Sequence, residues 1–276
     1  MIRPVLVLAA SEFQEGLRNR WVVSAVLLLA TLAFSLALLG SSPIGETRAS
    51  TLNVTTVSLA SLSVYLIPLI ALMLTYDSII GERERGTLLL LLTYPITRGQ
   101  VILGKFLGHF AIIALALVIG YGTTGIYLAT TGDTLPIDWV LFLSMLSTSL
   151  MLGSVFLGAG YLISVCVSSR ATAAGIAIST WLFVVVIYDL LLLGVVLVDS
   201  EHSISADMFS LILLFNPADV YRLFNLAGSE AASLVSGSLG TLDSSMLSTG
   251  VLITALALWI ALPLLSSIWV FKRLEL

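Results

Sequence analysis

Residues 106–130 read FLGHFAIIALALVIGYGTTGIYLAT, a run of 25 residues that contains no Asp, Glu, Lys or Arg. A helix rises about 1.5 Å per residue, so about 20 mostly apolar residues cross the hydrocarbon core of a bilayer. A strand of a membrane barrel would be about 10 residues long and would alternate apolar and polar side chains. The run therefore predicts a transmembrane helix.

Five more runs of the chain are long and apolar enough to cross a bilayer. They are Trp21–Leu39, Val57–Thr75, Trp139–Val167, Ala171–Val198 and Gly250–Val270. Of the 276 residues, 58% are hydrophobic and only 10% are charged, which excludes a soluble globular domain. The predicted fold class is an all-α polytopic membrane protein with six transmembrane helices. The apolar run Phe209–Phe215 is too short to add a seventh.

The basic residues predict the orientation, because Lys and Arg near membrane spans stay on the cytoplasmic side. All but two of the 12 Lys and Arg lie in the first 20 residues, the second and fourth loops, and the C-terminal tail. The exceptions are Arg48 and Arg222. Both termini are therefore predicted to be cytoplasmic. With 16 acidic against 12 basic residues and no basic cluster, no nucleic-acid partner is expected.

The first 20 residues predict an amphipathic helix ahead of the first span. Pro4 suits a first helical turn, and Leu6, Ala10, Phe13 and Leu17 follow at helical spacing. Such a helix would lie in the inner membrane interface, with its apolar side against lipid. The alternative is a simple helical extension of the first span.

The second loop, residues 77–105, combines charges and leucines on the cytoplasmic side. Glu-Arg-Glu-Arg at 82–85 is followed by Gly-Thr and by five leucines at 88–92. A short leucine helix outside the bilayer has to bury one face in a partner or in the membrane surface.

Two local signals bound that leucine helix. Tyr94 precedes Pro95 and is biased against helical geometry, so the helix is predicted to end there. Thr97 and Gln100 match a capping box, which predicts that the next helix begins at about Arg98.

This loop resembles the coupling region of the type-2 ABC transporter permeases, whose members carry a Glu-rich, Gly-Thr-Leu, Leu-rich and Pro-containing stretch between their second and third spans. The match covers Gly81–Lys105, with weaker echoes in Ser11–Arg20 and Asn216–Leu223. The resemblance implies a type-2 ABC exporter fold in the bacterial inner membrane, with a connecting helix at 1–20 and a transmembrane domain at 21–276. It also implies that two permeases pair with two cytoplasmic ATPase subunits, which bind the ATP and Mg.

Carried over to this chain, the resemblance assigns contacts with the ATPase to the second loop. The charged side chains at 82–85 would make charge-assisted contacts, the stretch 87–92 would fill a cleft, and Pro95 would fix the exit angle. The residues concerned are Glu82, Arg83, Glu84, Arg85, Gly86, Thr87, Leu88, Leu89, Leu90, Leu91, Leu92, Thr93 and Pro95. The alternative for the charged residues is a solvated turn.

Within that family the Glu-Arg-Glu-Arg run and the large acidic fifth loop are most similar to permeases of the nitrous-oxide-reductase maturation systems. This resemblance implies an outer-side accessory protein on residues 199–249 and a role in denitrification through copper-site assembly. A helix at Ala218–Ala227, ended by Gly228, is predicted within the loop, and it could dock this partner or cap the bundle. The candidate contacts are Asn216, Pro217, Asp219, Tyr221 and Arg222.

Asp189 is the one charged residue deep within a predicted span, where a carboxylate costs about 2.5–3.5 kcal/mol on insertion scales. Because no Lys or Arg lies in any predicted span, its expected partners are hydroxyls, backbone, water or cargo, unless it is protonated. Asp189 is thus a pathway candidate or a satisfied structural acid. An ion-coupled secondary carrier that uses Asp189 and an intramembrane enzyme are the alternative functions.

Other polar residues predict no catalytic or metal site in this chain. Residues 99–106 nearly spell a phosphate-binding loop but lack its hydroxyl, so no cofactor is expected. The spacing of His202, Met208 and Met246 matches no known set of metal ligands. Cys166 is expected to pack in the core, and His109 is expected to lie at the membrane interface. Gly104 and Gly108, four residues apart, predict the close approach of another helix.

Overall fold

The computed structural model describes residues 2–40, 51–131, 135–198, 206–226 and 248–274, and nearly all of them are helical. The helices are α1 (Ile2–Arg18), α2 (Arg20–Gly40), α3 (Thr51–Thr75), α4 (Ile80–Glu84), α5 (Thr87–Leu92), α6 (Arg98–Thr131), α7 (Pro136–Cys166), α8 (Arg170–Leu182), the π-helical turn η1 (Phe183–Ile187), α9 (Tyr188–Val198), α10 (Ala206–Leu214), α11 (Pro217–Leu226) and α13 (Thr249–Arg273). Six helical segments within these ranges are long and apolar enough to cross a membrane. They coincide with the six predicted spans, so the predicted fold class is confirmed.

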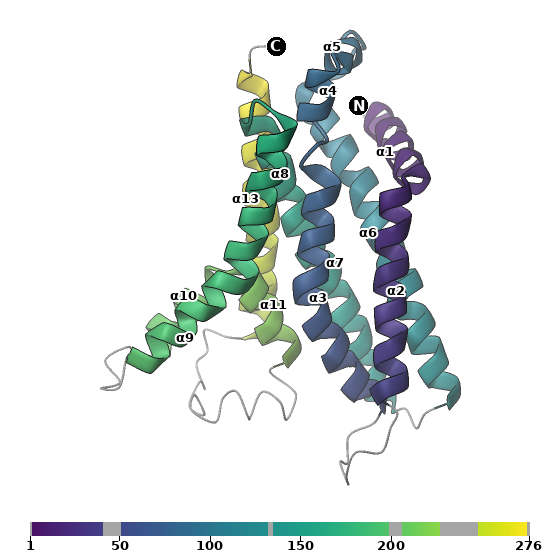
Figure 1. Cartoon of the computed structure of the whole chain (residues 1–276), viewed down its shortest axis with the longest axis vertical. Coiled ribbons are helices and arrows are strands. Elements are labelled where there is room, and N and C mark those ends of the chain that lie inside the picture. The colour runs from purple at the N-terminus through teal and green to yellow at the C-terminus, as the bar shows by residue number, and fades with distance from the viewer. Residues whose placement is uncertain (1, 41–50, 132–134, 199–205, 227–247, 275–276) are drawn as a thin grey trace.

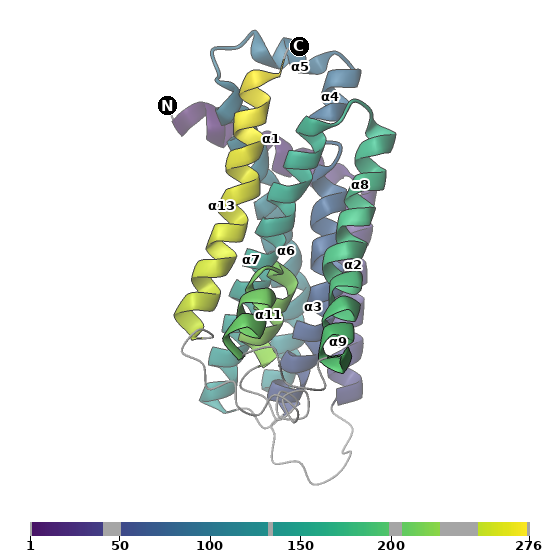
Figure 2. The ribbon, with the colours of Figure 1, turned by 90° about the vertical axis from the view of Figure 1, so that its left-hand side faces the viewer.

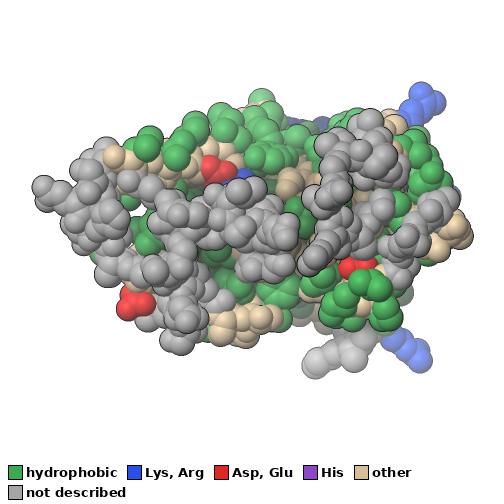
Figure 3. Space-filling view, turned by 90° about the horizontal axis from the view of Figure 1, so that it is seen from below, with side chains coloured by type: hydrophobic (Ala, Val, Ile, Leu, Met, Phe, Trp, Pro, Cys, Tyr) green, Lys and Arg blue, Asp and Glu red, His purple; other side chains and the backbone are tan. Residues whose placement is uncertain are grey.

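The six spans form a bundle around α7, which packs against α3, α6 and α13 (Figures 1 and 2). Large apolar side chains of α7, such as Leu152 and Phe156, are fully buried at its centre. Many leucines on the outside are exposed, including Leu190 and Leu262, as a lipid-facing surface requires. Viewed from below, the described surface is mainly hydrophobic with a few acidic groups (Figure 3).

The beginning of α1, the end of α13, and helices α4 and α5 all lie at one end of the bundle, which we call the terminal end (Figure 1). The fold therefore places both chain ends and the second loop on the same side, as the distribution of basic residues predicts.

The amino-terminal helix is separate from the first span. α1 ends at Arg18, and the backbone N–H of Trp21 donates to the side-chain oxygen of Asn19 at 3.0 Å, which caps the start of α2. Figure 2 shows α1 crossing the bundle toward α2. The chain therefore forms two separate helices here, and α1 is not a continuous extension of the first span.

α1 packs against α6 at two glycines, which confirms the predicted close approach. A Cβ atom added to Gly108 would lie 2.6 Å from the Cβ of Glu12 and 2.8 Å from the carbonyl oxygen of Ala9. Likewise, one added to Gly104 would meet the Cβ of Leu8 at 2.9 Å. The absence of side chains on α6 is what allows α1 to lie this close.

Substituting Gly108 with alanine is expected to destabilise the fold by about 1–3 kcal/mol, because the backbone of α1 would have to move away from α6. Gly122 on the same helix is a matched control, since nothing lies within 4 Å of a Cβ added there. Gly122→Ala should instead stabilise α6 by about 0.5–1 kcal/mol through its higher helix propensity. Thermal unfolding of the two purified variants in one detergent compares them, and equal melting temperatures would contradict the packing argument.

The fifth span is broken by the turn η1 and leans away from the bundle toward its far end (Figure 1). Of the six spans, α8–η1–α9 buries the smallest share of its apolar stretch. A π turn leaves backbone carbonyls without their usual helical partners, and such turns are frequent at functional sites.

Within the described part of the fifth loop, α11 folds back among the spans. α11 packs against α3, α7 and α13, with Ala218, Val220 and Tyr221 fully buried. The helix begins at Pro217, one residue before the predicted start at Ala218, and the side chain of Asn216 accepts a 2.9 Å hydrogen bond from the N–H of Ala218. The predicted terminator Gly228 and residues 199–205 and 227–247 lie outside the described residues.

Candidate functional site

The leucine helix α5 has one face in the protein and one face exposed. Leu88 is 1% exposed and joins the core of the bundle, and Leu91 and Leu92 are partly buried against it. Leu89 and Leu90 are 57% and 66% exposed. The predicted short helix is therefore present, and part of its apolar surface is left uncovered by this chain.

The local sequence explains why α4 and α5 form two short helices. Gly86 adopts a φ of +72° between them, a left-handed conformation that favours glycine and turns the chain sharply. After α5, the N–H of Thr97 donates to Gln100 Oε1 at 2.9 Å, and the N–H of Gln100 donates to Thr97 Oγ1 at 3.3 Å. This confirms the predicted capping box and the start of α6 at Arg98.

The acidic residues of the Glu-Arg-Glu-Arg run face the protein. Glu82 Oε1 lies 2.8 Å from Lys105 Nζ, and Glu84 Oε1 accepts a 2.9 Å hydrogen bond from the backbone N–H of Arg170. Arg85 is exposed and donates from Nε to the carbonyl of Gly81 at 3.0 Å. Glu82 is thus held within the protein by Lys105, whereas Glu84 is exposed apart from its contact with Arg170.

Lys105 joins three elements at the terminal end. Its side chain is only 3% exposed, and its ammonium pairs with Glu12 of α1 as well as with Glu82 of α4. One turn along α6, His109 Nδ1 and the hydroxyl of Tyr161 form a hydrogen bond. His109 is only 6% exposed, because α1 covers this part of α6.

A second polar cluster fixes the start of the fifth span. Both carboxylate oxygens of Asp77 bind the guanidinium of Arg170, the first residue of α8. Beside it, the N–H groups of Ile79 and Ile80 donate to Ser164 Oγ at 3.0 and 3.1 Å. The turn before α4 is thus tied to both α7 and α8.

The intramembrane carboxylate of Asp189 has a cationic partner, contrary to the sequence-based expectation. Arg222 of α11 binds Asp189 Oδ2 and also Asp219 Oδ1, the latter at 3.1 Å. The expectation failed because Arg222 was assigned to an outer loop, whereas α11 returns among the spans. The spacing of Asp219 and Arg222, three apart on one helical face, was the available signal.

The π turn of the fifth span is bound by the same helix. Asn216 Nδ2 donates to the carbonyl of Val184 at 2.9 Å, and Arg222 Nη2 donates to the carbonyl of Val185 at 3.4 Å. The guanidinium also lies 5.8 Å from the centroid of the Tyr65 ring. α11 therefore satisfies backbone groups that the π turn exposes.

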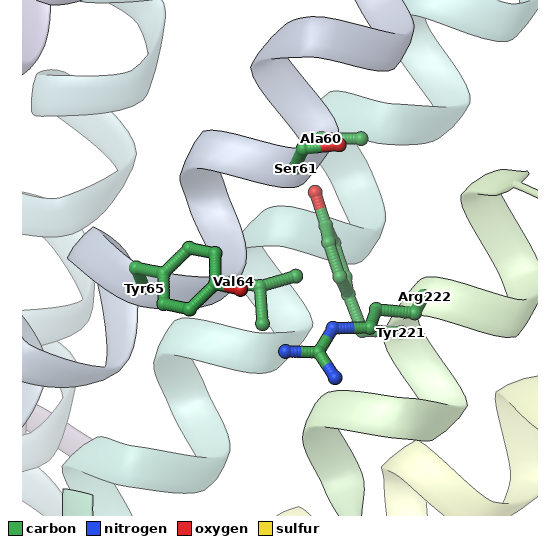
Figure 4. Close-up of a pocket in the computed structure, with 6 residues that line it drawn as sticks. All are labelled: Ala60, Ser61, Val64, Tyr65, Tyr221 and Arg222. Atoms are coloured by element: carbon green, nitrogen blue, oxygen red, sulfur yellow. The ribbon is translucent and has the colours of Figure 1, made fainter. Parts of the chain in front are cut away.

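A cavity of about 100 Å³ lies beside Arg222, between α3 and α11 (Figure 4). Its lining residues are Ala60, Ser61, Val64, Tyr65, Tyr221 and Arg222. It is large enough to hold water molecules. Asp189 is not among the lining residues, although its partner Arg222 is.

Residues 6–276 match the family model described as ABC-2 family transporter protein. The chain belongs to this family of ABC transporter permeases. It is also 41% identical over 269 residues to the "Probable ABC transporter permease protein NosY" of Stutzerimonas stutzeri, covering 96% of this chain and 97% of that protein. The identity to the protein of the same description from Pseudomonas aeruginosa is 41% over 272 residues, covering 98% of each.

The permease is therefore a multi-pass protein of the bacterial inner membrane and a subunit of an ABC transporter. Such transporters include an ATPase partner, and their permease subunits are generally non-catalytic membrane components. Within the described ranges, no group of three or more His, Cys, Asp or Glu residues is placed to hold a metal ion. His202 and Met246 lie outside those ranges.

The residues predicted to bind an outer partner are largely enclosed by the permease itself. Asn216 and Asp219 are 1% and 5% exposed, and the hydroxyl of Tyr221 shares a 2.8 Å hydrogen bond with Ser149 of α7. These three side chains offer no open docking surface, so the described geometry favours the alternative, in which this helix packs on the bundle. Cys166 was expected in the core but is exposed at the end of α7.

Proposed function

We propose that this permease acts as a homodimer that couples ATP hydrolysis by two cytoplasmic ATPase subunits to export or to motion of an outer-side partner. The process we propose is maturation of the copper sites of nitrous oxide reductase. This rests on the resemblance to the maturation permeases and on the two relatives named NosY, which share 41% identity with nearly the whole chain.

The observation that carries the coupling role is the uncovered apolar surface of α5. Leu89, Leu90 and Tyr94 are each more than half exposed, and they lie at the terminal end, beyond the ends of the spans (Figure 1). In the proposed orientation this end faces the cytoplasm, where exposed leucines beside charged residues are characteristic of a protein interface. We propose that this surface, with Arg83, Arg85, Gly86, Thr87, Thr93 and Pro95 around it, docks the ATPase.

The ion pair of Asp189 weighs against a secondary carrier. A carrier site needs a carboxylate that is available to its ion, and Asp189 is engaged by the guanidinium of Arg222. We therefore propose a structural role for Asp189. An outer-side accessory protein stays part of the proposal for the loop 199–249, with contacts other than the buried Asn216, Asp219 and Tyr221.

Purification of the tagged chain from its native membranes tests the proposal. The wild-type permease is expected to carry one ATPase subunit per copy. Leu89→Ser with Leu90→Ser should reduce this by about ten-fold or more, because burying each leucine side chain contributes about 1.5–3 kcal/mol and ten-fold in affinity corresponds to about 1.4 kcal/mol. Leu6→Ser with Val7→Ser is the matched control, since these α1 residues are 56% and 70% exposed at the same end. A wild-type chain that purifies without an ATPase, or a double α5 variant that keeps it, would refute the docking role.

A further inference from the structure

The start of the fifth span is fastened to the coupling segment α4–α5 by two acidic side chains. Asp77 precedes α4 and binds the Arg170 guanidinium with both carboxylate oxygens. Glu84 ends α4 and accepts the backbone N–H of Arg170 at 2.9 Å, at the first turn of α8. An acidic side chain at a helix N-terminus is favourable both as a hydrogen-bond acceptor and toward the helix dipole.

The same short segment also carries side chains that are exposed. Arg85 is exposed, and so are Leu89 and Leu90 of α5. The two acidic residues of the Glu-Arg-Glu-Arg run bind other elements of this chain, whereas the exposed Arg85 donates to the carbonyl of Gly81 within α4. The contacts divide the segment into an inner side and an outer side.

The fifth span is well suited to move as a unit. It buries the smallest share of its apolar stretch among the six spans, so little packing opposes its displacement. Arg170 in its first turn is bound by Glu84, and Asn216 and Arg222 bind the π turn and Asp189. Between them, Trp181 Nε1 donates to the carbonyl of Tyr65 on α3 at 2.9 Å, and the hydroxyl of Tyr188 donates to the carbonyl of Ile212 at 2.7 Å. A displacement of α4 therefore has a direct polar route to α8 and, through the span, to α11.

We propose that Asp77 and Glu84 are positioning residues that carry the displacement of the coupling segment into the fifth span and on to α11. This inference rests on the proposed function, in which the ATPase moves α4–α5. Charge-assisted hydrogen bonds suit this task because they are short, directional and stronger than neutral ones. Docking and transmission are thereby assigned to different residues of one loop.

The test follows the far end of the fifth span in the permease–ATPase complex in lipid nanodiscs. A spin label is attached at Leu197→Cys, a position that is 73% exposed at the end of α9, in a background in which the exposed Cys166 is replaced by serine. In the otherwise unmodified permease, ATP should change the label's mobility. The variant Asp77→Asn with Glu84→Ala should reduce that change in mobility about five-fold or more, which is the fold-change that a typical coupling free energy produces. The amount of bound ATPase should stay the same.

Further variants separate transmission from docking and from folding. Arg85→Ala should lower the amount of bound ATPase but leave the ATP response of each assembled complex intact. The single variant Asp77→Arg should lose much of the response, and adding Arg170→Asp should restore it, because the reversed pair rebuilds the ion pair while the backbone contact of Glu84 stays in place. A full response in the Asp77/Glu84 variant, loss of the ATPase together with the response, or no restoration by the reversed pair would each overturn the inference. An unmodified chain without any ATPase would refute the proposed function instead.

Discussion

Replacing Arg222 with methionine is expected to destabilise the permease by about 3–5 kcal/mol, the range found when one partner of a buried ion pair is removed. The guanidinium binds both Asp189 and Asp219, so a single substitution leaves two carboxylates without a cationic partner. The side chain of Asp219 is only 6% exposed, and water compensates it poorly. Two donor contacts to the fifth span, at Asp189 and at the carbonyl of Val185, are lost together.

The measurement is the melting temperature of the purified permease, which should fall by roughly 10 °C for a chain of this size. The triple variant Arg222→Met, Asp189→Asn, Asp219→Asn should recover most of the loss, because removing all charges of a buried cluster is far less destabilising than removing one. If the single and triple variants melt alike, the cluster does not act as an ion pair, and the cavity beside Arg222 is hydrated enough to screen it.

The fold was predictable because its determinants are local. A run of 20 apolar residues forms a spanning helix wherever it occurs, and basic flanks set its direction. The start of α6 depends only on Thr97 and Gln100, and the end of α5 on the Tyr94–Pro95 pair. Even the approach of α1 was visible as two glycines on one face of α6.

The contacts of the candidate site were not predictable, because they join residues distant in sequence. Asp189 and Arg222 lie on separate helices, and hydropathy assigned Arg222 to a loop because α11 is short and amphipathic. The side chain of Glu82 is oriented by its ion pair with Lys105 of α6. The side chain of Glu84 is oriented by its hydrogen bond to the first turn of α8. Charge patterning identifies such residues as polar, and only the packing of the helices decides which of them face a partner chain.

Replacing Lys105 with methionine should have an effect of similar size at the other end of the bundle. Its ammonium neutralises Glu12 and Glu82, whose side chains are 12% and 20% exposed, so the variant leaves two largely buried carboxylates side by side. The expected loss is again about 3–5 kcal/mol. Because the repulsion acts between α1 and α4, α1 should detach from α6 before the spans separate.

Limited proteolysis in detergent distinguishes this local opening from global unfolding. In Lys105→Met, cleavage within α1 should accelerate while the six spans stay protected, since α1 is held to α6 by Lys105 and by the glycine contacts at Gly104 and Gly108. Arg85→Met removes a cation from the same end, but that cation is exposed, so its cleavage pattern should match that of the wild type. Addition of Glu12→Gln and Glu82→Gln to Lys105→Met should slow cleavage again. If it does not, the ammonium holds α1 through the packing of its hydrocarbon stem, and the two carboxylates are not the destabilising element.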